Sequence, residues 1–351
     1  MAQRLPQFDV IKGIAIFMVV MGHVLTMCIR DIDQALCFKL IGQTHMPLFF
    51  FIAGFFTYRA TSDGTPFALP RLSQRFLQLI IPMVVVGTLW FLYFPHSGLQ
   101  SPLSDNLQIA LSDEYKQGYW FPLVLFEITV IYTILAPVIR CGRTFAGEAV
   151  ICLIISAIVA VITFSLLSID ARNYSSMGLS ATFLPVYLAG VLAGKHRNGF
   201  QRLHSAQWAT TAAILLGGYM VYIRMYYWEF EFMASPYWTM AVTVIWHLCL
   251  AIVAFAVITP WTDRASQSNT MISTWSLLGR ESLGIYLLHY FLLFPMPFMQ
   301  EPLRAMGLGF VPTFTVAAVV ATVIIAITLA VIRIVKISNP LATILIGAKS
   351  K

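Results

Sequence analysis

The feature that most constrains this chain is the run Phe8–Ile29, which is long and apolar enough to cross a bilayer but contains ionisable side chains. It reads FDVIKGIAIFMVVMGHVLTMCI, and its ionisable residues are Asp9, Lys12 and His23. A transmembrane helix needs about 20 mostly apolar residues. A charged group at the centre of such a helix costs ~2.5 kcal/mol or more, so intramembrane charges are typical of functional sites. The run is therefore both the first predicted span and the first candidate site.

Helical spacing places the three ionisable residues on one face of this predicted span. Lys12 and His23 are eleven positions apart, which is close to three turns of ~3.6 residues. Asp9 precedes Lys12 by three positions and joins the same stripe. At a rise of ~1.5 Å per residue, the cation lies roughly 16 Å from the imidazole along the helix axis. We expect this stripe to face the protein interior or a wet cavity.

Composition extends the membrane prediction to the whole chain of 351 residues. Hydrophobic residues make up 59% of it and charged residues 11%, whereas soluble domains average about 25% charged residues. These values exclude an ordinary soluble enzyme and predict an all-α integral membrane protein, with one domain over residues 1–351. About ten apolar runs are long enough to span a bilayer, at residues 10–29, 41–58, 76–95, 119–139, 148–168, 179–195, 207–225, 238–259, 276–299 and 312–335.

The distribution of lysine and arginine predicts the orientation of these spans. Sixteen of the 22 lysines and arginines fall on the side that holds both termini, and six fall on the other side. Cytoplasmic loops carry the excess of these residues. We therefore expect both termini in the cytoplasm, which an even number of spans also requires. Lys12 would then lie near the inner end of its span, and His23 nearer the outer side.

Charge and cysteine spacing narrow the classes of partner. The net charge is +7, but the basic residues are scattered at the ends of apolar runs. A nucleic-acid site would gather them into one patch, so nucleic-acid binding is not expected. The five cysteines show no CxxC spacing, which favours neither a metal site nor a redox pair. We expect free thiols, with a disulfide between Cys28 and Cys37 as the alternative.

Histidines in the first two predicted spans are candidates for the site. An imidazole has an ordinary pKa near ~6.5, so His23 suits a general base near neutral pH. The alternative is a histidine that links helices by a hydrogen bond. The shared stripe with Lys12 and Asp9 favours function. His45 opens the segment HMPLFFFIAGFF, which Pro47 interrupts. It either binds substrate beside a cavity, where irregular backbone is tolerated, or lies at the interface before an ordinary kink.

Charged residues of the third and fourth predicted spans are further candidates. Arg71 and Arg75 lie four positions apart in RLSQRFLQLIIP. Two guanidinium groups at a cytoplasmic entrance suit a phosphorylated ligand, although ordinary positive-inside charge explains them too. Glu127 lies deep in the fourth span, seven positions after Trp120 and on the same face. Such a carboxylate must pair or protonate, so it orients a histidine, pairs with a cation or acts as acid or base.

The ninth predicted span contains a polar stripe in LGRESLGIYLLH. Ser282, Tyr286 and His289 follow one another at steps of four and three on one predicted helix. His289 is either functional or a core histidine with its hydrogen bonds satisfied. The chain has no GxSxG nucleophile motif and no HxxxxD pattern. No pair of short, broken spans recurs in matching halves, so an inverted-repeat transporter is not indicated.

These segments together resemble the acyltransferase 3 superfamily of integral membrane acyltransferases, in the branch related to fucose 4-O-acetylases. The resemblance rests on the basic-x10-His pattern of FDVIKGIAIFMVVMGHV, on HMPLFFFIAGFF, on the Arg-rich entry to the third span, on the WF pair at Trp120 and on LGRESLGIYLLH. It covers essentially the whole chain. Lys12 stands where many relatives have Arg, the arginines are spaced RxxxR where some members have RxxR, and Ala53 stands where Ser is common.

What the resemblance implies is O-acylation, usually acetylation, of a hydroxyl group on a carbohydrate or glycolipid of the cell envelope. The donor would be cytoplasmic acetyl-CoA, no cofactor would be bound, and the location would be the inner (cytoplasmic) membrane. By position, His23 would be the essential histidine and Lys12 its basic partner, while Arg71 and Arg75 would help to hold the CoA phosphates. Glu127 remains a candidate catalytic residue. The candidates for acceptor binding are Asp9, His45, Trp120, Ser282 and His289.

A second functional class is also consistent with the residues. A transporter or flippase for a lipid-linked sugar or small solute would likewise place charges and aromatic rings inside the membrane. Acetyl-CoA binding would favour the enzyme, and substrate flux without acetyl-CoA would favour transport.

Overall fold

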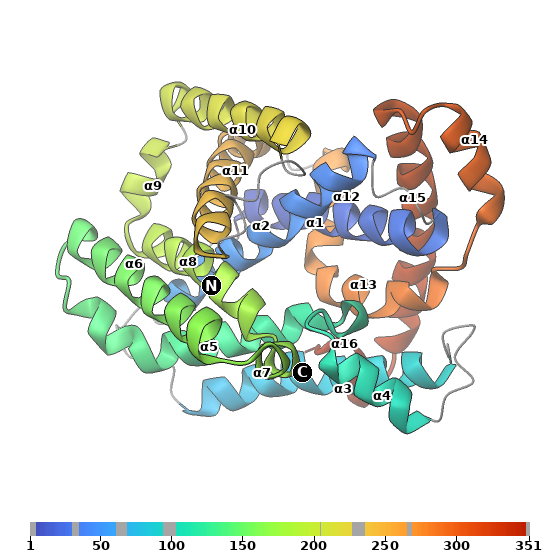
Figure 1. The fold of residues 1–351 in the computed structure, drawn as a ribbon, viewed down its shortest axis with the longest axis horizontal. Coiled ribbons are helices and arrows are strands. Elements are labelled where there is room, and N and C mark those ends of the chain that lie inside the picture. Colours follow the sequence, from blue (N-terminus) through green and yellow to red (C-terminus); the bar gives the residue numbers. More distant parts are fainter. Residues whose placement is uncertain are drawn as a thin grey trace. The chain divides into compact units, whose positions relative to one another are not determined.

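Helices make up every regular element in the part of the chain that the structure describes (Figure 1). This computed structural model describes residues 5–29, 35–60, 69–93, 103–203, 205–226, 236–264 and 269–348. The α-helices are α1 (Pro6–His23), α2 (Leu36–Ala60), α3 (Leu69–Tyr93), α4 (Leu103–Ser112), α5 (Trp120–Arg140), α6 (Phe145–Val161), α7 (Ile169–Ser175), α8 (Met177–Lys195), α9 (Arg197–Leu203), α10 (Ala206–Tyr226), α11 (Pro236–Arg264), α12 (Thr270–Arg280), α13 (Ser282–Leu288), α14 (Gln300–Ala305), α15 (Phe310–Val335) and α16 (Asn339–Ile346). Shorter π and 3-10 segments are η1 (Val24–Ile29), η2 (Lys116–Gly118), η3 (Ile162–Leu166), η5 (His289–Leu292) and η6 (Pro297–Met299).

Eight helical stretches among the described residues are long and apolar enough to cross a membrane, and a bent pair is a ninth candidate. The eight are Pro6–Ile29, Leu36–Tyr58, Leu72–Leu92, Trp120–Arg140, Phe145–Leu166, Met177–Lys195, Tyr237–Arg264 and Phe310–Val335. The protein is an all-α, multi-pass membrane protein, which confirms the predicted fold class. The remaining predicted span, at 207–225, forms α10, but its side chains from residue 219 onward lie outside the described part.

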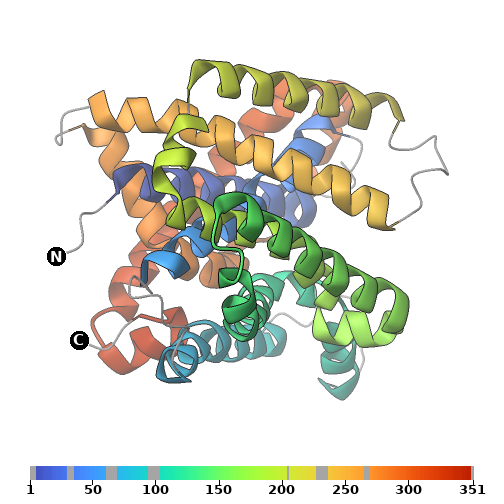
Figure 2. The same cartoon turned by 90° about the vertical axis from the view of Figure 1, so that its left-hand side faces the viewer.

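The chain forms two compact units, each built from separated segments. The first unit comprises Met1–Phe49, His204–Met225 and Cys249–Ala342. The second comprises Phe50–Leu203, Tyr226–Leu248 and Thr343–Lys351. The helices α2 and α11 contribute to both units, and Figure 2 shows α11 as one long, unbroken helix.

In the first unit, α1 packs against α12, α13 and α15. The crossing of α1 and α12, which lie side by side in Figure 1, is very close. A Cβ atom on Gly13 would lie 2.0 Å from the carbonyl oxygen of Trp275, and one on Gly279 would lie 1.9 Å from that of Asp9. Small residues allow helix backbones in membranes to approach closely. These two glycines thus fix the N-terminal half of α1 against α12.

In the second unit, α5 packs against α3 and α8, and α6 also packs against α8. The second half of α2 contacts α8 through two glycines. A Cβ atom on Gly54 would lie 2.0 Å from the carbonyl oxygen of Tyr187, and one on Gly190 would lie 2.0 Å from that of Phe51. The hydroxyl groups of Thr57 and Tyr187 are hydrogen-bonded at 2.8 Å. Backbone contact and a buried hydrogen bond therefore hold α2 to α8 here.

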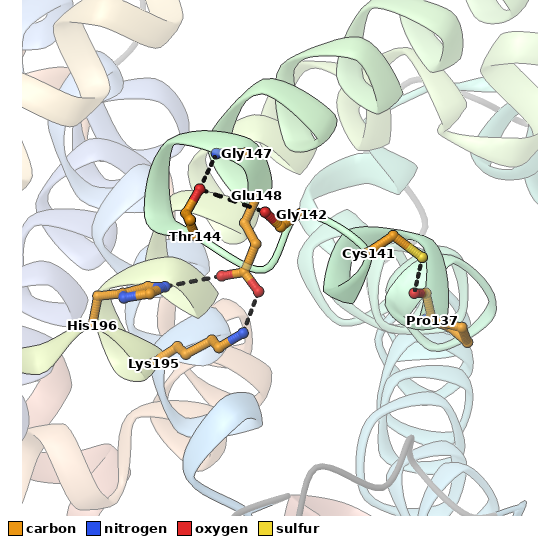
Figure 3. A network of polar contacts seen from close by, with 8 residues as sticks. All are labelled: Pro137, Cys141, Gly142, Thr144, Gly147, Glu148, Lys195 and His196. Atoms are coloured by element: carbon orange, nitrogen blue, oxygen red, sulfur yellow. Dashed lines mark hydrogen bonds and ion pairs between the residues drawn. The ribbon is translucent and has the colours of Figure 1, made fainter.

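A buried carboxylate joins α6 to the end of α8 (Figure 3). Glu148 is 1% exposed, and its Oε1 accepts from the Lys195 ammonium group. Its Oε2 lies 2.9 Å from Nε2 of His196. Thr144 caps the N-terminus of α6 by accepting a hydrogen bond from the Gly147 N–H at 3.1 Å, a common helix cap. His196 lies between α8 and α9, where it joins this structural ion-pair network.

The ninth predicted span is not one straight helix, so that prediction is wrong. It is divided into α12, α13, η5, η6 and α14, and the stretches Ser282–Leu292 and Pro297–Ala305 make an angle of 95°. Glu281 has φ −91° and ψ 7°, which interrupts the helix between α12 and α13. Pro295 and Pro297 lack the backbone N–H groups that a continuing helix would need. These interruptions lie before Ser282 and after Leu292, so Ser282 and His289 belong to the same helical stretch, Ser282–Leu292.

The second predicted span is more regular than expected. The helix α2 runs without a break from Leu36 to Ala60 and includes Pro47. The expected interruption there is wrong. Gly54 serves the close contact with α8 instead. The cysteines are free thiols, as expected, and Cys28 and Cys37 are both buried.

Candidate active site

His23 is the last residue of α1 and is followed directly by the π-helical segment η1. The helix is unbroken between Lys12 and His23, so the expected axial separation of roughly 16 Å is retained. Single-turn π segments are frequent at functional sites. The N–H of Met296 donates a hydrogen bond of 2.6 Å to the carbonyl oxygen of Cys28. This bond ties the end of η1 to the chain segment that follows η5.

Both ring nitrogens of His23 make hydrogen bonds within the first unit. Its Nδ1 lies 2.8 Å from Nε2 of His289, and its Nε2 lies 3.0 Å from the hydroxyl of Tyr290. The Nδ1 of His289 lies 2.9 Å from the carbonyl oxygen of Ile285, one turn earlier. His289 is 0% exposed and Tyr290 is 1% exposed, whereas His23 is partly exposed. The result is a hydrogen-bonded chain from Tyr290 through His23 and His289 to the backbone.

These hydrogen bonds determine which ring nitrogen of each neutral histidine carries the proton. A carbonyl oxygen can only accept a hydrogen bond, so Nδ1 of His289 carries a proton and donates to the carbonyl oxygen of Ile285. The Nε2 of His289 is then bare and accepts from Nδ1–H of His23. The Nε2 of His23 is therefore the basic nitrogen, and it accepts from the Tyr290 hydroxyl. A base oriented in this way is the arrangement that general-base catalysis needs.

His45 lies in the same unit, in the first half of α2. Its Nδ1 lies 2.6 Å from the carbonyl oxygen of Ile41, one turn earlier. The Ile41 side chain borders α1, because its Cγ2 would lie 3.4 Å from a Cβ atom on Gly22. The imidazoles of His45 and His23 are close enough for their charges to interact. The structure thus brings His23, His45 and His289 together.

Lys12 and Asp9 form an ion pair of 3.0 Å at the other end of α1. Both side chains are partly exposed, at 24% and 15%. The expected placement of these residues on one face is confirmed. Glu281, which the sequence places at the inner mouth of the ninth span, forms an ion pair of 2.6 Å with Lys336.

Glu127 and Trp120 belong to the second unit. The Ser180 hydroxyl donates to Oε2 of Glu127 at 2.5 Å, a short bond typical of a hydroxyl that donates to a carboxylate. Trp120 is 9% exposed and packs among aromatic rings, with Phe183 stacked at 5.6 Å and Phe50 at 6.2 Å. The Trp120 indole is therefore part of an aromatic core, while Glu127 holds α5 to α8.

Of the two arginines expected to hold the donor, the structure describes the side chain of Arg75 but not that of Arg71. Arg75 lies in α3 of the second unit, close enough to the Tyr187 hydroxyl for an electrostatic interaction. Arg71 lies in the first turns of α3, and its side chain is outside the described part of the structure. Their shared role as a phosphate site therefore stays a prediction.

The loop before α5 holds a buried lysine in the second unit. Nζ of Lys116 donates to the carbonyl oxygens of Leu111, Asp113 and Asn173 at 2.8, 2.8 and 2.5 Å. Burial lowers the pKa of this ammonium group, and the nearby acidic residues oppose the shift. Burial likewise raises the pKa of the Glu114 carboxyl, against a hydrogen bond from the Leu179 backbone. The three carbonyl oxygens satisfy Lys116, so its role is to hold the loop that leads into Trp120.

Comparison with known proteins assigns the family. A profile described as an acyltransferase domain matches residues 5–331, which is nearly the whole chain. The chain belongs to this acyltransferase 3 family. The family resemblance stated from the sequence motifs is thereby confirmed.

Two curated relatives of this acyltransferase-family chain are nodulation proteins named NolL. The one from Sinorhizobium fredii is 37% identical over 123 residues, which are 32% of this chain and 32% of that protein. The one from Mesorhizobium japonicum is 33% identical over 137 residues, or 36% of this chain and 35% of that protein. The matches thus span about a third of the length of these relatives. No solved structure matches the chain.

Sequence reasoning on this acyltransferase-family chain missed Tyr290. On a straight helix, Tyr290 would point about 100° away from its neighbour His289. In the structure both side chains nevertheless contact His23, one at each of its ring nitrogens. Pro295 and Pro297 are the available signal in the sequence that the chain becomes irregular soon after Tyr290. The sequence placed Ser282 beside His289, but Ser282 makes no side-chain hydrogen bond within the described residues.

Proposed function

We propose that this protein is an O-acyltransferase that moves an acetyl group from cytoplasmic acetyl-CoA to a hydroxyl of a cell-envelope carbohydrate or glycolipid. His23 is the general base. The observation that carries the proposal is the hydrogen-bonded chain Tyr290–His23–His289–Ile285, because it presents the bare Nε2 of His23 as a proton acceptor. Membership of the acyltransferase family supports the reaction class.

The proposed reaction is a direct transfer. The acceptor hydroxyl takes the place of the Tyr290 hydroxyl at Nε2 of His23 and gives its proton to that nitrogen. The acceptor oxygen forms a bond to the thioester carbonyl carbon, and the carbon–sulfur bond breaks. The CoA thiolate then takes the proton from the imidazolium of His23, so the base is regenerated and no other reactant is needed.

His289 and Tyr290 have separate roles in this mechanism. His289 is a positioning residue, since it accepts from Nδ1–H of His23 and holds the ring in one tautomer. Tyr290 lies 3.0 Å from the basic nitrogen. When the acceptor takes its place at that nitrogen, the Tyr290 hydroxyl donates to the oxygen that becomes negative during the attack.

The donor approaches from the inner side in this proposal. Lys12 and the arginines Arg71 and Arg75 bind the phosphates of CoA, although Lys12 must then share its charge with Asp9. The roughly 16 Å between Lys12 and His23 suits an extended pantetheine arm. The membrane in question is the inner (cytoplasmic) membrane, with both termini in the cytoplasm.

A thiol-release assay tests the proposal. The full-length protein in lipid nanodiscs is incubated with acetyl-CoA, and the free CoA thiol is measured. We expect wild-type protein to release thiol and His23→Ala to lose at least ~10²-fold of that rate, the usual contribution of a general base. Thermal unfolding of both proteins checks that the fold is retained. Wild-type rates in a folded His23→Ala protein contradict the proposal, and sugar flux into sealed proteoliposomes without thiol release favours transport.

A further inference from the structure

We propose that this site recognises an acceptor with two neighbouring hydroxyl groups, of which His23 receives one and Nε2 of His45 receives the other. The inference rests on the proposed function and specifies the class of acceptor. His45 is a positioning residue in this scheme, since it binds the hydroxyl beside the one that reacts.

The first step of the argument is the protonation of His45. Its Nδ1 donates to the carbonyl oxygen of Ile41 at 2.6 Å, and a carbonyl oxygen can only accept. The neutral ring therefore has a bare Nε2. The same kind of contact, to the carbonyl oxygen of Ile285 four residues earlier, fixes the proton of His289 on its Nδ1. Within the described part of the chain, no residue donates to Nε2 of His45.

The second step is the position of His45 relative to the base. Ile41, which holds the ring, borders α1 at Gly22, the residue just before His23. The hydroxyl of Thr44, the residue beside His45, also donates to Sδ of Met18 in α1 at 3.6 Å. His45 and His23 are both partly exposed as residues.

The third step is the chemistry of a ligand that suits both rings. Nε2 of His45 and Nε2 of His23 both lack a proton, so each accepts a hydrogen bond, in His23 after the acceptor has displaced the Tyr290 hydroxyl. Neighbouring hydroxyl groups supply two O–H donors at close spacing. Ionised carboxylate and phosphate groups only accept, so they cannot satisfy either nitrogen. A simple alcohol satisfies one nitrogen and leaves the other without a partner, which disfavours its binding. The pair of histidines therefore selects a 1,2-diol over a single alcohol.

The test uses simple probe acceptors with the full-length protein in nanodiscs and acetyl-CoA. The probes are cis- and trans-1,2-cyclohexanediol, with cyclohexanol as the single alcohol, and acetyl esters are measured by mass spectrometry. We expect kcat/KM for at least one diol to exceed that for cyclohexanol by roughly five- to tenfold, the effect of one neutral hydrogen bond. This advantage is counted beyond the twofold statistical advantage of a second hydroxyl.

Two variants of His45 test the roles of its two ring nitrogens separately. His45→Asn places an amide N–H near the position of Nδ1 and retains the bond to Ile41, but it does not reach the position of Nε2. We expect it to lower kcat/KM for the diol by more than for cyclohexanol, so that the diol preference is lost. His45→Gln places an amide oxygen near the position of Nε2, so we expect it to retain most of the preference. Thermal unfolding of both variants serves as the control for folding.

The outcomes distinguish this inference from the proposed function. If wild-type protein shows no diol preference, or if folded His45→Asn retains it, the inference is wrong while thiol release still supports an acyltransferase. A folded His45→Asn protein that slows all acceptors equally, water included, also contradicts it. If wild-type protein releases no CoA thiol with any acceptor, the proposed function is wrong, and the inference that rests on it is wrong with it.

Discussion

At the scale of single residues, backbone carbonyl oxygens set the protonation of the histidines in the first unit. His289 and His45 each donate to the carbonyl four residues earlier, at 2.9 and 2.6 Å. In serine proteases, a buried aspartate orients the catalytic histidine. An additional carboxylate inside a membrane would cost several kcal/mol, whereas a neutral histidine held by its own helix adds no charge. This arrangement therefore orients His23 at low cost in a bilayer.

A pair of His289 variants tests this orienting role. His289→Ala removes the acceptor of the His23 N–H, so we expect thiol release to fall on the order of 10²-fold through kcat, as the base loses its tautomer. His289→Gln places an amide oxygen near the position of Nε2 and should restore part of that rate. The KM for acetyl-CoA should stay unchanged in both variants. Equal rates for His289→Ala and wild-type protein would show that His23 does not depend on this partner.

The sequence identifies part of this site for a physical reason. His23 and His289 stand out because an ionisable group in an apolar run is costly, whatever the tertiary structure. Tyr290 does not stand out, because tyrosine is common at span ends. The bond from His23 to His289 joins positions 266 apart in the chain. No spacing rule predicts such a contact without the packing of α1 against α13.

At the scale of secondary-structure elements, glycines determine how closely the helices of each unit approach. Gly13 and Gly279 allow α1 to cross α12, and Gly54 and Gly190 allow α2 to contact α8. The apolar runs predict the helices well, because length and hydrophobicity are local properties. The apolar runs do not predict which glycines contact a neighbouring helix. Gly42, for example, lies in α2 with no atom within 4 Å of its ideal Cβ position.

Alanine substitutions at these glycines test the close approach. Gly13→Ala places a methyl group 2.0 Å from the Trp275 carbonyl oxygen, and a backbone atom cannot move aside cheaply. We expect the free energy of unfolding to fall by about 1–3 kcal/mol, the usual cost of overpacking. The matched control is Gly42→Ala, where the open space and the better helix propensity of alanine predict no loss. Denaturant titration in mixed micelles measures both, and equal stability of the two variants would contradict the close crossing.

At the scale of the whole molecule, orientation in the membrane follows from charge more than from packing. The excess of lysine and arginine on one side predicts cytoplasmic termini, and it places the loop between α5 and α6 in the cytoplasm. That loop contains Cys141, which is exposed, whereas Cys28, Cys37, Cys152 and Cys249 are buried. One native thiol therefore reports the orientation of the protein.

Labelling with a membrane-impermeant maleimide tests this orientation. We expect inside-out vesicles to give labelled protein, with label at Cys141, and intact cells to give none. Cys141→Ser is the control, and it should remove the label from inside-out vesicles. Label on Cys141 in intact cells would reverse the predicted orientation, and with it the side from which acetyl-CoA reaches Lys12.

The π-helical segment η1 has a consequence for how this helix tolerates insertions and deletions. A π turn accommodates one more residue than the α turn it replaces, so Val24–Ile29 is equivalent to an α-helix with a single-residue insertion just after His23. Removing one residue there would restore α-helical hydrogen bonding and leave His23 in place. It would also shorten the path from His23 to Cys28, whose carbonyl oxygen now accepts from the Met296 N–H. Length changes at this point would therefore alter the chain around His23 while keeping the histidine itself.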